Sequence, residues 1–111
     1  VKPPQAAPME QDFIFELDPF WVPVKDEQGN TNFLVCRFST IAKTETVNKE
    51  IEKQLMTVRD AMYYYLRNKS LDFLLAAANR DTIKKDLTSV VNSYLTLGQI
   101  EDVLMESYLG H

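Results

Sequence analysis

The chain has 111 residues, which is enough for one domain with a single hydrophobic core. Its composition is 45% hydrophobic and 25% charged, as in ordinary globular proteins, and its formal net charge is −4 at pH 7. This negative charge argues against a nucleic-acid partner and against docking on anionic lipid, because both attract proteins through lysine and arginine patches. The sequence contains no apolar run of about 18 residues, so none of it predicts a membrane-spanning helix.

Residues 1–11 (VKPPQAAPMEQ) carry three of the five prolines and have no hydrophobic periodicity. This composition predicts an extended, flexible linker. Because the sequence starts at Val1 and not at a methionine, we expect a fragment or processed form that this linker would tether to anything upstream. We predict a single domain over residues 12–109.

Two strand-like stretches open this domain. Residues 12–18 (DFIFELD) alternate their apolar side chains between two faces, which is typical of a strand. Two prolines follow that cannot donate to a ladder, so we predict an irregular extended segment that buries Phe20 and Trp21. After the turn sequence KDEQGNT at 25–31, residues 32–43 predict a second strand, paired with the first as an antiparallel hairpin. One face of this second strand carries Leu34, Cys36, Phe38 and Thr40.

Residues 44–68 predict one long amphipathic helix, capped by Thr44 or Thr46. Its apolar stripe at helical spacing consists of Val47, Ile51, Leu55, Val58, Met62, Tyr65 and Leu66. A short helix over Leu71–Ala78, capped by Ser70, and a helix over residues 81–97 that stops at Gly98 are expected next. The buried face of that last helix is predicted to hold Ile83, Leu87, Val90, Val91, Tyr94 and Leu95.

The predicted elements end in a strand over Ile100–Leu109 with apolar side chains on both faces, which favours a central or well-covered position. We therefore predict an α+β fold in which a small three-stranded sheet packs against helices.

Three tyrosines follow one another at the end of the long helix. Successive helical residues are about 100° apart, so Tyr65 lies in the apolar stripe and Tyr63 at its edge, while Tyr64 points away. Two interpretations remain open for Tyr64: the short helix or a loop covers it, or it contacts another chain. Arg59 and Asp60 lie on the polar side of the same helix.

The residues of catalytic sites are mostly missing from this sequence. Its single histidine is His111 at the end of the chain, so a Ser–His–Asp or Cys–His arrangement within the fold is excluded. The three glycines are isolated and form no phosphate loop. Cys36 is the only cysteine, which excludes an intrachain disulfide and a four-thiolate metal site. We predict no enzymatic activity, no metal and no cofactor.

Four segments in order resemble the periplasmic domain of the flagellar basal-body-associated FliL family. They are Phe15–Val24 (FELDPFWVPV), Phe33–Phe38 (FLVCRF), Val58–Leu66 (VRDAMYYYL), and the final passage through Leu87, Asn92, Leu95, Gly98, Ile100 and Val103. The resemblance covers residues 13–109. Two places depart from the family pattern: Trp21 with Pro23, and the last strand at Val103–Tyr108 (VLMESY).

The resemblance implies a stomatin/SPFH-type fold and a non-enzymatic role. Family members have one inner-membrane helix, a linker and this periplasmic domain. They are thought to form homo-oligomeric rings around the ion-conducting stator units of the flagellar motor, supporting stator activity, swimming and swarming. The implied partners are further copies of the chain and the stator proteins, especially the stator's periplasmic linker. Our candidates for protein-interface residues are Phe20, Trp21, Arg59, Asp60 and Tyr64.

Two other function classes remain. One is a periplasmic or cytoplasmic adaptor, unrelated to flagella, that grips a peptide at a sheet edge beside an apolar groove. The other is a small enzyme or ligand-binding domain, which would need an enclosed polar pocket. The sequence offers no group of residues to line such a pocket.

Overall fold

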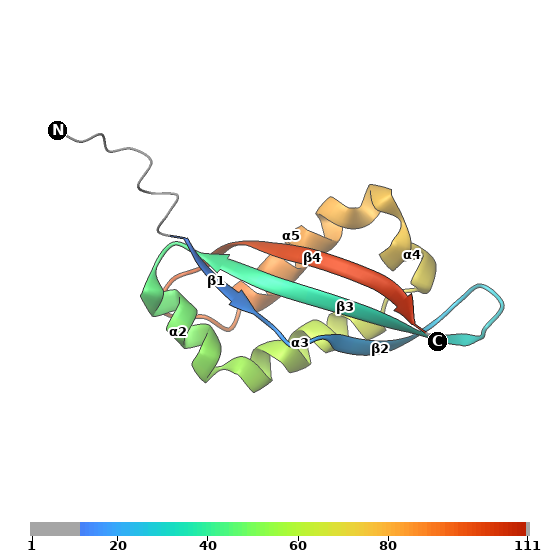
Figure 1. Cartoon of the computed structure of the whole chain (residues 1–111), viewed down its shortest axis with the longest axis horizontal. Coiled ribbons are helices and arrows are strands. Elements are labelled where there is room, and N and C mark those ends of the chain that lie inside the picture. Colours follow the sequence, from blue (N-terminus) through green and yellow to red (C-terminus); the bar gives the residue numbers. More distant parts are fainter. Residues whose placement is uncertain (1–11, 111) are drawn as a thin grey trace.

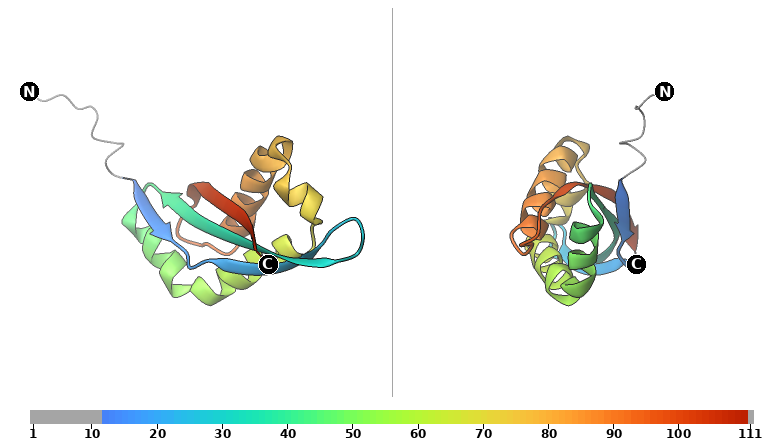
Figure 2. Two further views of the ribbon diagram at one scale, coloured as in Figure 1. Left: turned by 45° about the vertical axis from the view of Figure 1, so that its right-hand side comes forward. Right: turned by 90° about the vertical axis from the view of Figure 1, so that its left-hand side faces the viewer.

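The computed structural model describes residues 12–110 of the chain, with side chains described for residues 12–106. The predicted linker over residues 1–11 lies outside this range. One antiparallel sheet and one layer of helices make up the described part, and Figure 2 shows the helices on one side of the sheet. The predicted α+β class is confirmed.

The long strand β3 (Thr31–Ala42) is the centre of the sheet (Figure 1). Along one side it pairs first with β2 (Phe20–Lys25) and then with β1 (Phe13–Glu16). Along its other side it pairs with β4 (Ile100–Gly110). The predicted antiparallel pairing of the first strand with the strand at 32–43 is confirmed by β1 and β3, but the strand that the turn joins to β3 is β2. The sheet therefore has four strands where we predicted three, because β1 and β2 share one side of β3.

The prediction that residues 19–24 are irregular is wrong, because these residues form most of β2. A proline inside a strand is tolerated where no further strand pairs with it, and Pro23 lies in such an edge strand. Pro19 lies at the break between β1 and β2, where the N–H of Leu17 still donates to the carbonyl of Phe38 at 3.0 Å. Pro19 therefore lies where β1 and β2 separate, and Pro23 lies in an edge strand. Neither proline prevents β1 and β2 from pairing with β3.

The long amphipathic stripe forms two helices, α2 (Glu45–Lys53) and α3 (Leu55–Arg67), where we predicted one. They meet at Gln54, whose φ of −102° and ψ of 22° depart from helical values while its N–H still bonds to the carbonyl of Glu50. The predicted cap Thr44 is confirmed, since its hydroxyl oxygen accepts from the N–H of Val47 at 3.3 Å. The interruption at Gln54 therefore divides the predicted helix in two, while the same residues make up its apolar stripe.

Two further helices complete the layer. The short helix α4 (Leu71–Leu75) begins at the predicted cap Ser70, and a 3-10 turn, η1 (Ala77–Asn79), follows it. The helix α5 (Arg80–Asn92) ends five residues earlier than predicted. Tyr94 and Leu95 therefore lie in the loop after α5, and Tyr94 is 40% exposed where we predicted it to be buried.

The core lies between the inner face of the sheet and the helices. The face of β3 that carries Leu34, Cys36, Phe38 and Thr40 is the inner one, since Phe38 is 1% and Thr40 is 0% exposed. The helices contribute the buried side chains Val47, Ile51, Val58, Met62, Leu66, Ile83, Leu87 and Val91. Each fully buried aliphatic or aromatic side chain contributes about 1.5–3 kcal/mol to folding. This core fixes the helices to one face and leaves the other face open.

The loop from α5 to β4 is held against α2. Gly98 has a φ of +146°, and a Cβ at this position would lie 2.6 Å from Cγ2 of Val47. The predicted role of Gly98 as the end of the last helix is wrong, because α5 already ends at Asn92. The glycine instead allows the loop backbone to approach α2 closely.

The prediction of a central or well-covered last strand is also wrong. Among the described residues, β4 pairs only with β3 and so forms an edge of the sheet. Its apolar residues on both faces have different environments, with Val103 buried under the helices and Leu104 43% exposed on the open side. The implied stomatin-type relationship stays a prediction.

Candidate functional site

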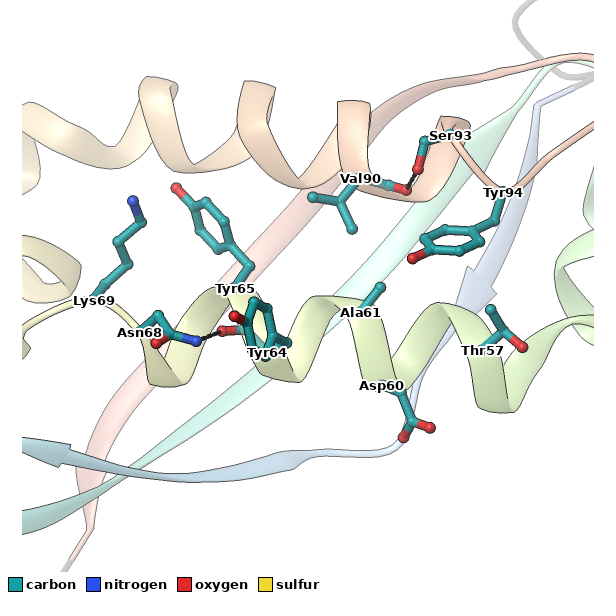
Figure 3. A pocket seen from close by; sticks show the side chains of 10 residues that line it. All are labelled: Thr57, Asp60, Ala61, Tyr64, Tyr65, Asn68, Lys69, Val90, Ser93 and Tyr94. Carbon is teal, nitrogen blue, oxygen red and sulfur yellow. Dashed lines mark hydrogen bonds between the residues drawn. The ribbon is translucent and has the colours of Figure 1, made fainter.

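An aromatic groove runs between α3 and α5 on the helical side of the molecule (Figure 3). Its volume is about 630 Å³. It is lined by Tyr64 and Tyr65 of α3 and by Tyr94 of the loop after α5. The small side chains of Ala61 and Val90 leave space between these rings. The other lining residues are polar or charged, namely Thr57, Asp60, Asn68, Lys69 and Ser93, so the groove combines aromatic and polar walls. Concave surfaces of this mixed kind can bind other molecules.

Two groups in the groove are engaged within the molecule. The hydroxyl of Tyr65 donates to the carboxylate of Asp86 and so links α3 to α5. Burial and this bond to a carboxylate both raise the pKa of Tyr65, so its phenol stays protonated. The ammonium of Lys69 lies 4.9 Å from the ring centroid of Tyr65 and 5.4 Å from that of Phe73. These contacts make the groove a fixed feature of the fold.

Tyr64 is the free aromatic of the groove. Its side chain is 68% exposed, and the side-chain amide of Asn68 donates to its backbone carbonyl at 2.7 Å. Among the described residues, neither the short helix α4 nor a loop covers it. Of the two interpretations left open by the sequence, the covered one is wrong, and the contact with another chain stays a prediction.

Arg59 and Asp60 are neighbours in sequence but point to different places. The guanidinium of Arg59 lies 4.1 Å from the ring centroid of Phe20 and donates to the carbonyls of Asp18 at 2.6 Å and Pro19 at 3.2 Å. Arg59 therefore holds the segment between the end of β1 and the start of β2. Asp60 is exposed beside the groove. The geometry favours a positioning role for Arg59 and leaves Asp60 available to a partner.

Phe20 and Trp21 are likewise separated by the strand they share. The alternation of β2 buries Phe20, which is 2% exposed and packs edge-on against Phe38 at 5.5 Å. The same alternation turns Trp21 to the other face, where its side chain is 60% exposed. Our prediction that Trp21 is buried is wrong, because it rested on an irregular segment that is in fact a regular strand.

The second candidate surface is the open face of the sheet, which no helix of the described residues covers (Figure 2). We define it by its large exposed apolar side chains: Ile14 of β1, Trp21 of β2, Phe33 of β3 and Leu104 of β4. The strand register places Trp21 opposite Val35 and Pro23 opposite Phe33, so these four residues are contiguous. Leu104 and Ile14 lie opposite Ser39 and Ile41, further along β3 and beyond Arg37. Residues 20–25 alternate between buried and more exposed side chains, as a strand does. This alternation indicates from the sequence that Trp21 lies on the open face, if Pro19 and Pro23 are not taken to exclude a strand.

The described residues contain no cluster of three or more histidine, cysteine, aspartate or glutamate side chains that could hold a metal ion. Burial raises the pKa of the Cys36 thiol to about 11. This keeps it protonated and inert. None of the helices from residue 12 onward is both long and apolar enough to cross a membrane.

Comparison with known proteins agrees with these features. The model of the family described as flagellar basal body-associated protein FliL matches residues 14–109. The flagellar protein FliL of Bacillus subtilis (strain 168) is 33% identical over 60 residues, which cover 54% of this chain and 43% of that protein. The flagellar protein FliL of Aquifex aeolicus (strain VF5) is 22% identical over 109 residues, covering 97% of this chain and 67% of that protein. The chain thus matches less than half the length of the Bacillus relative. Since the family model spans nearly the whole described domain, the chain belongs to the flagellar basal body-associated FliL family.

Proposed function

We propose that this chain is a non-enzymatic subunit that forms rings around stator units on the periplasmic side of the inner membrane. In this proposal residues 12–109 are the functional domain, and residues 1–11 connect it to a membrane anchor. Family membership gives the chain an accessory role at the flagellar basal body, and the partners and the compartment are our proposal. The observation that carries it is the presence of two exposed aromatic surfaces on opposite sides of one two-layer domain.

Opposite surfaces suit an assembly in which each subunit contacts two neighbours. A head-to-tail contact repeats from copy to copy and closes a ring when the rotation between copies permits. Weak contacts are sufficient when every copy is tethered to the same membrane, because tethering raises the effective concentration. The ring would hold the periplasmic linker of the stator in its open, load-bearing state and so support swimming and swarming.

The proposal is tested by deleting the gene and measuring swimming, swarming and the number of stator units at each motor. We expect fewer engaged stator units and weaker motility, restored by the wild-type gene but not by a Tyr64→Glu variant. Leu97→Glu is a matched control, because Leu97 is also an exposed apolar residue, at 61%, but lies outside both surfaces. Normal motility and normal stator number in the deletion strain would remove the stator assignment.

One observation favours a second function, the peptide-binding adaptor. The outer edge of β4 is unpaired among the described residues, and such an edge accepts an extended peptide as a further strand. Part of this edge is occupied, since the guanidinium of Arg80 donates to the carbonyl of Met105 at 3.2 Å. An adaptor would bind peptides without any motility defect in the deletion strain, so the same experiment separates the two functions.

A further inference from the structure

We infer that three side chains, those of Asn92, Asp102 and Arg80, form a cover over the outer edge of β4 and prevent two copies of the chain from pairing through this edge. We call these three residues the edge cover. The inference goes beyond the proposed function, because it states which contact between copies the fold excludes. It also stands without that function, since it rests on hydrogen bonds within one chain.

The two sides of the sheet differ in how readily they would pair with another strand. An exposed edge strand is ordinarily protected by being short, or by proline and lysine residues. On one side of β3, β1 has only 4 residues, and β2 contains Pro23 and ends at Lys25. On the other side, β4 extends over 11 residues (IEDVLMESYLG) and contains neither proline nor lysine. The edge formed by β4 therefore needs another kind of protection.

The acidic residues of β4 do not supply this protection by themselves. They are Glu101, Asp102 and Glu106. Like charges destabilise a strand pair when they lie directly opposite each other. If two β4 strands paired antiparallel with Val103 or Met105 at the centre, every one of these carboxylates would lie opposite an uncharged residue.

The register of the sheet shows which backbone groups of β4 point away from β3. In an antiparallel ladder the N–H and C=O of one residue point to the same side, and those of the next residue point to the other. Phe38 of β3 faces the β1 side, because its carbonyl accepts from the N–H of Leu17 at 3.0 Å. Met105 lies opposite Phe38, so its own N–H and C=O point away from β3, as do those of Val103.

The first member of the edge cover is Asn92, the last residue of α5. Its side-chain amide donates to the carbonyl of Ile100 at 3.4 Å, and its amide oxygen accepts from the N–H of Ile100 at 2.7 Å. A side-chain amide offers the same donor and acceptor as a peptide group. Asn92 therefore takes the place that the backbone of a neighbouring strand would take at the start of β4.

The other two members bond to outward groups nearer the middle of β4. The carboxylate of Asp102 accepts from the N–H of Val103 at 2.8 Å, and its other oxygen lies 3.5 Å from the ammonium of Lys84 on α5. The guanidinium of Arg80, at the start of α5, donates to the carbonyl of Met105 at 3.2 Å. A strand that joined β4 over this stretch would have to break these bonds before it formed its own.

The edge cover depends on the direction in which α5 crosses the sheet. From Arg80 to Asn92 the helix rises about 18 Å. From Ile100 to Met105 the strand extends about 17 Å. The two ends of α5 therefore meet the two ends of the covered stretch, and Figure 1 shows the start of α5 beyond the outer edge of β4.

A purely structural role would be to hold α5 on the sheet. The core already does this, because Ile83, Leu87 and Val91 of α5 are fully buried against it. Arg80, in contrast, is exposed at the rim of the molecule. An exposed edge matters most when copies are held close together, as in the proposed assembly, because tethering raises the effective concentration. The edge cover then leaves self-association to other surfaces.

Removal of the edge cover tests the inference. A variant with Asn92→Ala, Asp102→Ala and Arg80→Ala is compared with the wild-type chain by analytical ultracentrifugation over a range of concentrations. We expect the variant to self-associate at least about tenfold more tightly, because the freed backbone groups pair between copies. Amide hydrogen exchange followed by NMR locates the contact: the N–H groups of Val103 and Met105 should become protected as the variant's concentration rises.

A milder variant guards against a triple variant that fails to fold. Asp102→Ala with Arg80→Ala leaves Asn92 in place, and it should associate less tightly than the triple variant but more tightly than the wild type. Lys85→Ala with Ser89→Ala is the matched control, because both side chains are exposed on the same helix. This control should associate like the wild type. Thermal unfolding shows which variants are folded.

A second control separates the cover from the charge of Asp102. Asp102→Asn removes the charge but keeps an oxygen that accepts from the N–H of Val103, whereas Asp102→Ala removes both. In the monomer, exchange of this N–H should become about tenfold faster with alanine and stay close to the wild-type rate with asparagine. Asp102→Asn with Arg80→Ala should accordingly associate less tightly than Asp102→Ala with Arg80→Ala.

Three results would overturn the inference. The first is a folded double or triple variant that stays as monomeric as the wild type, which would mean that the bonds only fasten α5. The second is association that leaves Val103 and Met105 unprotected, which would place the contact on another surface. The third is equal association of the asparagine and alanine variants at Asp102, which would assign the effect to charge. Unchanged motility on gene deletion would remove the proposed function and leave these measurements unaffected.

Discussion

Two phenylalanines on the same strand illustrate how differently the two faces of this sheet are built. Phe38 of β3 is 1% exposed beneath the helices, whereas Phe33, five residues earlier, is 43% exposed on the open face. The covered face packs against the helices. The Gly98 loop lies close to α2, and Arg59 bonds to the backbone between β1 and β2. The open face carries side chains of similar size with nothing of the described chain above them. The first face stabilises the fold, and we infer that the second serves assembly.

The largest expected effect comes from truncating these two residues in parallel. Phe38→Ala should lower the free energy of unfolding by about 3–5 kcal/mol, because it leaves a cavity between the sheet and the helices. Phe33→Ala should lower it by less than about 1 kcal/mol, since the side chain is already partly in water. Denaturant unfolding of both variants measures the difference. Equal losses would show that the two faces are not distinct in the monomer.

The next effect concerns the loop that approaches α2. Gly98→Ala should cost about 1–3 kcal/mol, because the backbone has a φ of +146° and the new Cβ would meet Val47. Gly29→Ala is the matched control, since its φ is +84° but nothing lies within 4 Å of a Cβ there. It should cost about 1 kcal/mol from backbone strain alone. Thermal unfolding compares them, and combining Gly98→Ala with Val47→Ala tests whether the side-chain contact accounts for the excess.

A smaller effect is expected at the β1–β2 junction. Arg59→Ala should cost about 1–2 kcal/mol, because it removes the bonds to the carbonyls of Asp18 and Pro19 and the contact with the Phe20 ring. Arg59→Lys should retain part of this, since an ammonium lacks the planar fork. Arg67→Ala, on the exposed end of the same helix, should change stability by less than about 0.5 kcal/mol. If Arg59 belongs to the assembly surface instead, its loss will weaken self-association without changing the unfolding curve.

The smallest and most condition-dependent effect concerns Glu50. Its carboxylate accepts from the backbone N–H of Thr96 at 2.8 Å, the hydroxyl of Thr96 at 2.9 Å and the N–H of Leu97 at 2.9 Å. The N–H of Thr96 first, with the other donors, lowers the pKa of Glu50 below its ordinary value, while burial opposes this.

The sign of the pH dependence follows from that direction. A carboxylate whose pKa is lower in the folded state stabilises the fold above its unfolded pKa, and this contribution is lost as the pH falls through the folded pKa. The difference in melting temperature between wild type and Glu50→Gln should therefore be constant near neutral pH and shrink below about pH 4. Glu52→Gln, an exposed change on the same helix, is the control and should show no such trend. If the difference in melting temperature does not vary with pH, the stabilisation by Glu50 does not depend on the charge of its carboxylate.

Several features of the site could be read from local sequence, and others could not. The exposure of Tyr64 follows from helical periodicity, and the structure confirms it. Trp21 was one of our candidate residues, but we predicted it to be buried. Its exposure depends on the pairing of residues 20–25 with β3, a strand that comes later in the chain. Tyr94 was missed as part of the groove, since its place depends on where α5 ends and how α5 lies against α3.

The sequence by itself determined the order and type of nearly all elements, the apolar stripe, the residues that share each face of β3 and the caps Thr44 and Ser70. These depend on spacings of two to four residues, so short-range geometry is sufficient to specify them. Only the tertiary structure decided that the first strand is split in two, that β4 lies at an edge and that α2 and α3 part at Gln54. It also decided that aromatic side chains from distant segments form a groove opposite an open sheet face. These features depend on contacts between residues far apart in the chain, which no local pattern records.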